Sequence, residues 1–203
     1  IAAHQADPDL YVWTCLTENM FAPQPVQNCE TKAFRIHDNL VVYVNNGLST
    51  SIYQSTNGEI WAQLADKIND LPVPCHVRDI VQHNDTLYYI DGTSLYKSAD
   101  LLTWSKTDYA AASFTPINML LAYNNLPWCI VQDKESQQLM LATIIEDSIQ
   151  VATNIAELKD GFLPAEFPIS DFSALAFSGS SERPRAMIVG GRTINGDIVN
   201  SRW

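Results

Sequence analysis

Two stretches of the chain share one layout: Ile52-Tyr53-Gln54-Ser55-Thr56-Asn57-Gly58-Glu59-Ile60-Trp61 and Leu95-Tyr96-Lys97-Ser98-Ala99-Asp100-Leu101-Leu102-Thr103-Trp104. In both stretches an apolar run ends at a serine, a short polar turn follows, and a tryptophan closes the turn. Ser55 and Ser98 are 43 residues apart (98 − 55). A unit that recurs at such an interval is typical of architectures in which one small motif is used several times.

A second pattern precedes each stretch, an apolar run that is interrupted by a pair of Asp or Asn residues. Asp and Asn tolerate left-handed backbone geometry and bond their own backbone, so such pairs predict hairpin corners. The flanking runs are short and rich in Val, Ile, Tyr and Leu, which is strand chemistry. The predicted corners are Asp38-Asn39, Asn84-Asp85 and Asn124-Asn125.

The spacing extends to a third, weaker copy. Ser98 to Ala142 is 44 residues (142 − 98), while His37 to His83 is 46 (83 − 37) and His83 to Tyr123 is 40 (123 − 83). Three or four short strands per unit at a period near 43 favour propeller blades, because a β-sandwich does not repeat its own sequence at that interval. The sequence therefore predicts an all-β fold, a β-propeller of four-stranded antiparallel blades.

The same alignment divides the single propeller domain, 1–203, into blades. We expect 1–25 to end a preceding blade, 26–68, 69–110 and 111–158 to be whole blades, and 159–203 to be an incomplete one. Leu10-Tyr11-Val12-Trp13 would be a third strand of the preceding blade, and Ser201 would end a third strand of the last. An incomplete ring, a fragment of a longer propeller, is the favoured interpretation; the alternative is that the first and last pieces join in one shared blade.

Composition narrows the classes of function. The 203 residues are 46% hydrophobic, and 12 Lys+Arg against 23 Asp+Glu give a net charge of −11. This charge argues against a nucleic-acid partner, and no apolar run is long enough for a transmembrane segment. The cysteines Cys15, Cys29, Cys75 and Cys129 form no C-x-x-C pair; free buried thiols are favoured, and two disulfides remain the alternative.

The stretch from Ser55 to Trp61 resembles the Asp-box turn (BNR repeat) of sialidases and other secreted propellers. Asn57 replaces the acid there and one spacer is missing, whereas the stretch from Ser98 to Trp104 keeps the Asp and the spacing but lacks the Gly. The resemblance implies a structural role, with Asn57 and Asp100 accepting backbone N–H groups. Gly190-Gly191, followed by Asn195-Gly196 as a hairpin turn and then Trp203, looks like a kelch blade.

Together these motifs resemble an uncharacterised propeller family of Bacteroides surface lipoproteins. That resemblance implies export to the bacterial cell envelope, either the periplasm or the cell surface. It implies no established activity.

A further segment, Phe34-Arg35-Ile36-His37, resembles the Phe-Arg-Ile-Pro motif of sialidases, with His37 in place of the proline. The remaining arginines form no recognisable carboxylate-binding triad, so no catalytic residue is predicted, and a sialidase-like glycoside hydrolase with part of its site in missing blades is the alternative function. His4, His37, His76 and His83 lack metal-ligand spacing, and no cofactor motif is present, so neither a metal nor a cofactor is predicted.

The candidate ligand-binding residues come from the repeat. Five positions before His37, His83 and Tyr123 stand Lys32, Arg78 and Asn118, which we expect near the starts of the inner strands beside the central channel. Two cations there would attract an anionic sugar or another carboxylate. The alternative is that each cation pairs with a nearby acid, Glu30 or Asp79. The sequence thus favours non-catalytic binding of a glycan or a cell-surface protein, with a purely structural module as a further alternative.

Overall fold

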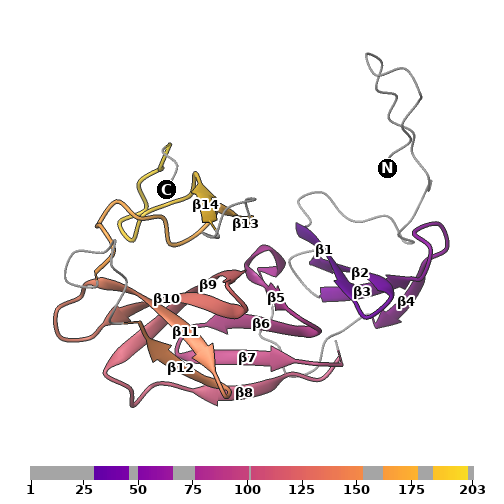
Figure 1. Cartoon of the computed structure of the whole chain (residues 1–203), viewed down its shortest axis with the longest axis horizontal. Helices are drawn as coiled ribbons and strands as arrows, with labels where there is room; N and C mark the ends of the chain where they lie inside the picture. The colour runs from indigo at the N-terminus through magenta and orange to yellow at the C-terminus, as the bar shows by residue number, and fades with distance from the viewer. Residues whose placement is uncertain are drawn as a thin grey trace. The chain divides into compact units, whose positions relative to one another are not determined.

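The computed structural model describes residues 30–45, 50–65, 76–100, 102–152, 162–177 and 185–200. Across these ranges the only helical element is a short 3₁₀ turn, η1 (Val77–Asp79), and the other elements are β-strands. The chain divides into two compact units, Ile1–Arg78 and Asp79–Trp203. Figure 1 labels the strands of both units.

The first unit contains one four-stranded sheet. Its strands are antiparallel and lie in chain order: β1 (Glu30–Ile36), β2 (Asn39–Asn45), β3 (Thr50–Ser55) and β4 (Ala62–Ala65). Phe34 and Tyr43 meet edge to face, with ring centroids 5.6 Å apart, and Val42, Val44 and Tyr53 form a separate buried cluster against Trp61. Five successive residues of β2, 41–45, are buried, so both faces of this strand are covered.

The second unit repeats this sheet twice. One copy is β5 (Val81–His83), β6 (Thr86–Asp91), β7 (Ser94–Ser98) and β8 (Ser105–Asp108). The next is β9 (Phe114–Tyr123), β10 (Leu126–Asp133), β11 (Leu139–Ile145) and β12 (Ser148–Val151). Both are antiparallel in chain order, and a two-stranded sheet, β13 (Ser173–Phe177) and β14 (Arg185–Val189), follows.

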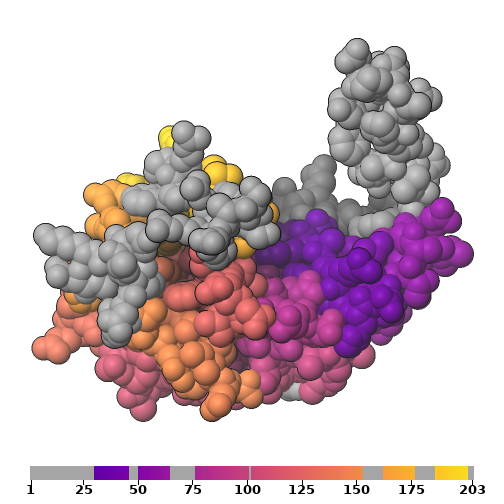
Figure 2. Space-filling model, viewed as in Figure 1, coloured from indigo at the N-terminus to yellow at the C-terminus, as the bar shows by residue number. Residues whose placement is uncertain are grey.

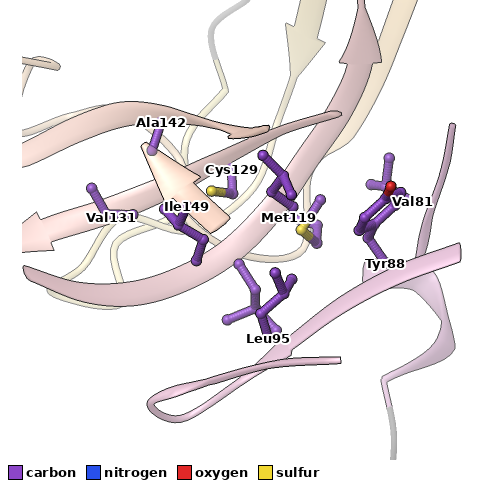
Figure 3. Close-up of a cluster of buried hydrophobic side chains, with 10 residues drawn as sticks. Val81, Tyr88, Leu95, Met119, Cys129, Val131, Ala142 and Ile149 are labelled. Atoms are coloured by element: carbon purple, nitrogen blue, oxygen red, sulfur yellow. The ribbon is translucent and has the colours of Figure 1, made fainter. Parts of the chain in front are cut away.

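Apolar side chains hold the two four-stranded sheets of this unit together. Val81, Tyr88 and Leu95 of one sheet form a buried cluster with Met119, Cys129, Val131, Ala142 and Ile149 of the other (Figure 3). In Figure 2 the pink residues of the first sheet adjoin the salmon and orange residues of the second. Sheets packed face to face in this way are what a propeller requires of neighbouring blades.

A second apolar cluster contains other side chains of the β9–β12 sheet. Leu120, Ile130 and Leu139 lie in it with Ile188 of β14, together with Leu163 and Phe167. The segment 163–168 therefore contributes core side chains. On the two-stranded sheet itself Leu175, Met187 and Val189 are exposed.

The inner hairpin corners confirm two of the three predictions. Asn84-Asp85 and Asn124-Asn125 are turns, and Asn84, Asn124 and Asn125 have positive φ. The prediction of a corner at Asp38-Asn39 is wrong by one residue, because the turn is His37-Asp38, His37 has φ 52°, and Asn39 already begins β2. His37 thus corresponds to Asn84 rather than to His83.

The two outer turns that carry the repeat are built alike. Oδ1 of Asn57 accepts the N–H groups of Glu59 and Ile60 at 2.9 and 3.0 Å. Oδ1 of Asp100 accepts those of Leu102 and Thr103 at 3.0 and 2.7 Å. The acceptor bonds the residues two and three positions ahead in both copies, so the two turns are equivalent at this contact.

The register also places Ser55 and Ser98 equivalently. Ser55 pairs with Leu40 and Ser98 with Leu87, the second residue of β2 and of β6. The matching residue of β10 is Pro127, which by the register Trp128↔Thr143 stands opposite Ile144, so the assignment of Ala142 as the third copy is wrong by two residues. This sheet replaces the long turn with a two-residue corner, Glu146-Asp147, in which both residues have positive φ.

The C-terminal segment is partly described. Thr193 and Asp197 flank the turn that contains Asn195-Gly196, and a single bridge joins Arg192 to Ile198. Gly191 has φ +107° and lies close to Pro168 and Ser170. Several predicted features lie outside the described residues: the segment 1–25, Cys15, Cys29, Cys75, Ser201 and Trp203.

Candidate functional site

The three predicted ligand-binding residues lie in different elements of secondary structure. Lys32 lies in β1 and Arg78 in the 3₁₀ turn η1, both in the first unit. Asn118 lies in the middle of β9, in the second unit. The expectation that all three stand near the start of an inner strand is therefore met by Lys32 alone, because β5 begins only at Val81 and β9 already at Phe114.

Lys32 and Arg78 come together. Nζ of Lys32 donates to the backbone oxygen of Arg78 at 2.6 Å, and it also lies 5.9 Å from the centre of the Phe34 ring. The Lys32 ammonium is thus held from one side by a carbonyl and from another by an aromatic face, which attracts cations through its quadrupole. The Arg78 side chain is 57% exposed, so a cationic surface remains beside this contact.

Glu30 organises the cluster from the first residue of β1. Its Oε1 accepts from a guanidinium nitrogen of Arg78 at 3.0 Å and lies 3.3 Å from Nδ1 of His76. The alternative considered for Arg78, pairing with a nearby acid, is confirmed by this contact. Glu30 is 21% exposed while His76 is 63% exposed, so the ion pair is at the surface.

The second oxygen of Glu30 has a different environment. Oε2 is buried and accepts no hydrogen bond within the described part of the chain. A buried polar atom without a partner costs free energy. The carboxylate therefore contacts Arg78 and His76 through one oxygen.

Asn118 is enclosed. The residue is 5% exposed, and its Nδ2 donates to the backbone oxygen of Ile169 at 3.1 Å. Its Oδ1 is buried and lacks a partner among the described residues. In this state Asn118 joins β9 to the segment before β13, and its side chain presents little surface to a ligand.

The repeat interval predicted Lys32 and Arg78 as equivalent positions, and the structure brings these two residues into contact. Lys32 and Arg78 are 46 residues apart, as are His37 and His83, and the side chain of Lys32 contacts the backbone of Arg78. Counted from the observed turns, however, the interval is 47 residues (84 − 37), which would match Lys32 with Asp79. Sequence reasoning treated Glu30 only as a pairing acid and did not include His76 in the site; the same interval, 46 residues from Glu30 to His76, would have joined them.

The sialidase-like segment lies nearby in sequence but has a different setting. Arg35 is 76% exposed, and its guanidinium is 4.0 Å from Asp38 on the adjoining turn. This is a local surface pair at the limit of an ion contact. It provides a useful reference cation, because it occupies the same sheet as Lys32.

The described residues also lack a metal cluster and a membrane-spanning helix. No group of three His, Cys, Asp or Glu side chains there could hold a metal ion. No helix among them is long and apolar enough to cross a membrane.

A solved structure and a family model are similar to this chain. No curated protein matches it. A solved structure, an exo-1,5-alpha-L-arabinanase from a bovine ruminal metagenomic library, is similar at 11% identity over 82% of this chain and 73% of that chain, with a TM-score of 0.33. The family model described as DUF6242 beta propeller domain matches residues 7–203. With the sequential four-stranded sheets, this match confirms the predicted propeller class, and the chain belongs to the DUF6242 beta propeller domain family.

Proposed function

We propose that this propeller binds a glycan without transforming it, and that Lys32 and Arg78 take up an anionic group of that glycan. The observation that carries the proposal is the 2.6 Å contact between Nζ of Lys32 and the backbone of Arg78, which brings two cationic residues to one place. Arginine and lysine are the usual partners of carboxylate and other oxyanions, arginine through a planar fork and lysine as a point charge.

The local charge supports this choice of ligand. Lys32, Arg78 and Glu30 together carry a formal charge of +1 (2 − 1), in a chain whose net charge is −11, and Asp79 follows Arg78 in η1. Over distances beyond a Debye length the acidic surface is screened, so the sign at the cluster decides which small groups bind there. An acidic sugar fits that sign better than a neutral one.

We also propose relationships that are more specific than the propeller family. Identical side-chain-to-backbone hydrogen bonds in two successive sheets support treating both outer turns as Asp-box-like. The Gly190-Gly191 and Asn195-Gly196 pairs support a kelch-like last segment. With these we propose the relationship to Bacteroides surface lipoproteins, the place in the bacterial cell envelope, and an incomplete ring in the present chain.

A glycan array that contains acidic sugars and their neutral counterparts tests the binding. Wild-type protein should bind acidic glycans preferentially, and Arg78→Ala and Lys32→Ala should each reduce that binding by about tenfold, the effect of a lost charge-assisted contact. Arg35→Ala is the matched control, because it removes an exposed cation from the same sheet. Equal loss of binding in all three variants, or binding to neutral glycans only, would contradict the proposed site.

A sialidase assay run beside the array examines the alternative. Release of sialic acid by wild-type protein, lost in Arg35→Ala, would establish the hydrolase and overturn non-catalytic binding. Unchanged substrate with retained binding is the expected result.

A further inference from the structure

We infer that Glu30 is an internal competitor for the anion that the Lys32–Arg78 site binds, so that it sets both the affinity and the kind of anion accepted. This inference rests on the proposed function. It assigns to Glu30 a role different from that of the two cations, since a carboxylate of the protein occupies a contact that a carboxylate of the ligand needs.

The geometry places Glu30 on the guanidinium itself. Its Oε1 lies 3.0 Å from a terminal nitrogen of Arg78, which is a normal distance for a charge-assisted hydrogen bond. The same oxygen is 3.3 Å from Nδ1 of His76. A single oxygen therefore serves two nitrogen groups, and Glu30 stands where an incoming anion would meet Arg78.

The contact is also incomplete. Oε2 of Glu30 is buried and has no hydrogen-bond partner among the described residues, so the pairing with Arg78 is through one oxygen rather than two. Arginine binds carboxylates best through two parallel hydrogen bonds. Because the Arg78 side chain is 57% exposed, its pairing with Glu30 is of the surface kind that contributes little stability.

These facts define what can displace Glu30. A planar carboxylate that makes two hydrogen bonds to Arg78 gains more than Glu30 loses, whereas an anion that makes one contact gains nothing over the resident oxygen. The site should therefore discriminate in favour of sugars that carry a carboxylate.

Titration with D-glucuronate, with D-glucose as the neutral counterpart, tests the inference on the whole chain. Glu30→Gln keeps the size of the side chain and removes its charge, and it should tighten glucuronate binding by about fivefold, the upper range for an exposed ion pair. Asp38→Asn is the matched control, since it removes an exposed charge from the neighbouring turn of the same sheet. It should leave the affinity unchanged, and glucose should bind none of the proteins.

The outcomes separate the two hypotheses. Weaker or unchanged binding by Glu30→Gln, with loss of binding in Arg78→Ala, would overturn the competitor role while the site itself stood. Equal tightening in Asp38→Asn would also overturn it, since the cause would be net charge.

Other outcomes concern the proposed function as well. If wild type, Glu30→Gln and Glu30→Ala all fail to bind glucuronate, the proposed function and this inference are overturned together. Binding that appears only in the Glu30 variants would support both. Melting curves of each variant establish that it is folded, and Glu30→Ala replaces Glu30→Gln if the amide destabilises the sheet.

Discussion

At the scale of single residues, side-chain oxygens of Asp and Asn organise the turns. Asp100 and Asn57 bond the backbone two and three residues ahead, and Asp133 does the same at the β10–β11 connection, with N–H groups of Glu135 and Ser136 at 3.1 and 2.6 Å. Asp108 accepts from the N–H of Ala110 at 2.7 Å. These residues act through local geometry, which is why turn chemistry could be predicted from sequence.

The hydrogen bonds to the ionised form give the first prediction. The N–H of Thr103 lowers the pKa of Asp100, that of Ala110 lowers the pKa of Asp108, and that of Ser136 lowers the pKa of Asp133. A carboxyl whose pKa is lower in the folded state contributes stability above its unfolded value, about 4, and loses it as the pH falls through the folded value. We expect urea unfolding to show less loss of stability between pH 6 and pH 2 when all three are Asn than in wild type.

Asn57 already has an amide at the position that corresponds to Asp100, so an asparagine is expected to fit the Asp100 turn as well. Asp100→Asn should keep the turn and cost little stability at pH 7, whereas Asp100→Ala should cost about 1 kcal/mol, as loss of a capping side chain does. An Asp100→Asn variant as unstable as Asp100→Ala would contradict the equivalence of the two turns.

Two glycines with positive φ give the second prediction. Gly92 has φ +56° and open space around it, whereas a Cβ on Gly191, at φ +107°, would lie 2.7 Å from both Pro168 Cβ and Ser170 O. Gly92→Ala should cost about 1 kcal/mol from backbone strain alone. Gly191→Ala should cost more than about 3 kcal/mol, because steric overlap adds to strain. Urea denaturation of both variants measures the difference, and equal costs would contradict the close packing at Gly191.

At the scale of elements, the sequence predicted strands and sheets well and register less well. The inner-hairpin prediction failed at His37 because residues 41–45 of β2 are all buried, so no alternation of polar and apolar residues indicated which position begins the strand. The third outer turn was misaligned because Glu146-Asp147 makes a two-residue corner in place of the longer turn. The repeat interval predicted that Lys32 and Arg78 are related, and the two residues are in contact, whereas the burial of Asn118 depends on Ile169, far away in sequence.

An ion pair between two sheets of the second unit gives the third prediction. Lys97 of β7 contacts Asp147 of the β11–β12 corner, with side chains 30% and 65% exposed. A double-mutant cycle of Lys97→Met and Asp147→Asn should return a coupling of about 0.5 kcal/mol that shrinks in 1 M salt.

The pKa of Tyr88 depends on the same ion pair, Lys97 and Asp147. Burial raises the pKa of Tyr88, Lys97 opposes the rise, and Asp147 adds to it. Lys97→Met should therefore raise the pKa of Tyr88 and Asp147→Asn should lower it, as followed by ultraviolet titration. Shifts in the opposite directions would show that Lys97 and Asp147 do not act on this phenol.

At the scale of the whole molecule, each four-stranded sheet is a repeat unit, and stability of the second unit depends on the apolar clusters between sheets. Cys129 lies in one of these clusters with no exposed surface, and it is a free thiol. Its burial raises its pKa to about 12. The expectation of a free, buried cysteine is met at this position.

The fourth prediction uses Cys129 as a probe of that packing. Iodoacetamide should not modify Cys129 in the native protein at pH 8, because the reagent needs an accessible thiolate. Modification measured on the Cys129 peptide by mass spectrometry should follow global unfolding in urea. Rapid labelling without denaturant would mean that the two sheets separate far more readily than the packing indicates.

The outer turns have one further consequence. The acceptor at their centre is an amide in one sheet and a carboxylate in the next, and both versions make the same two backbone contacts. A substitution between them alters the electrical character of the exterior while leaving the architecture in place. The acidity of such a protein can therefore be adjusted blade by blade, independently of its backbone scaffold.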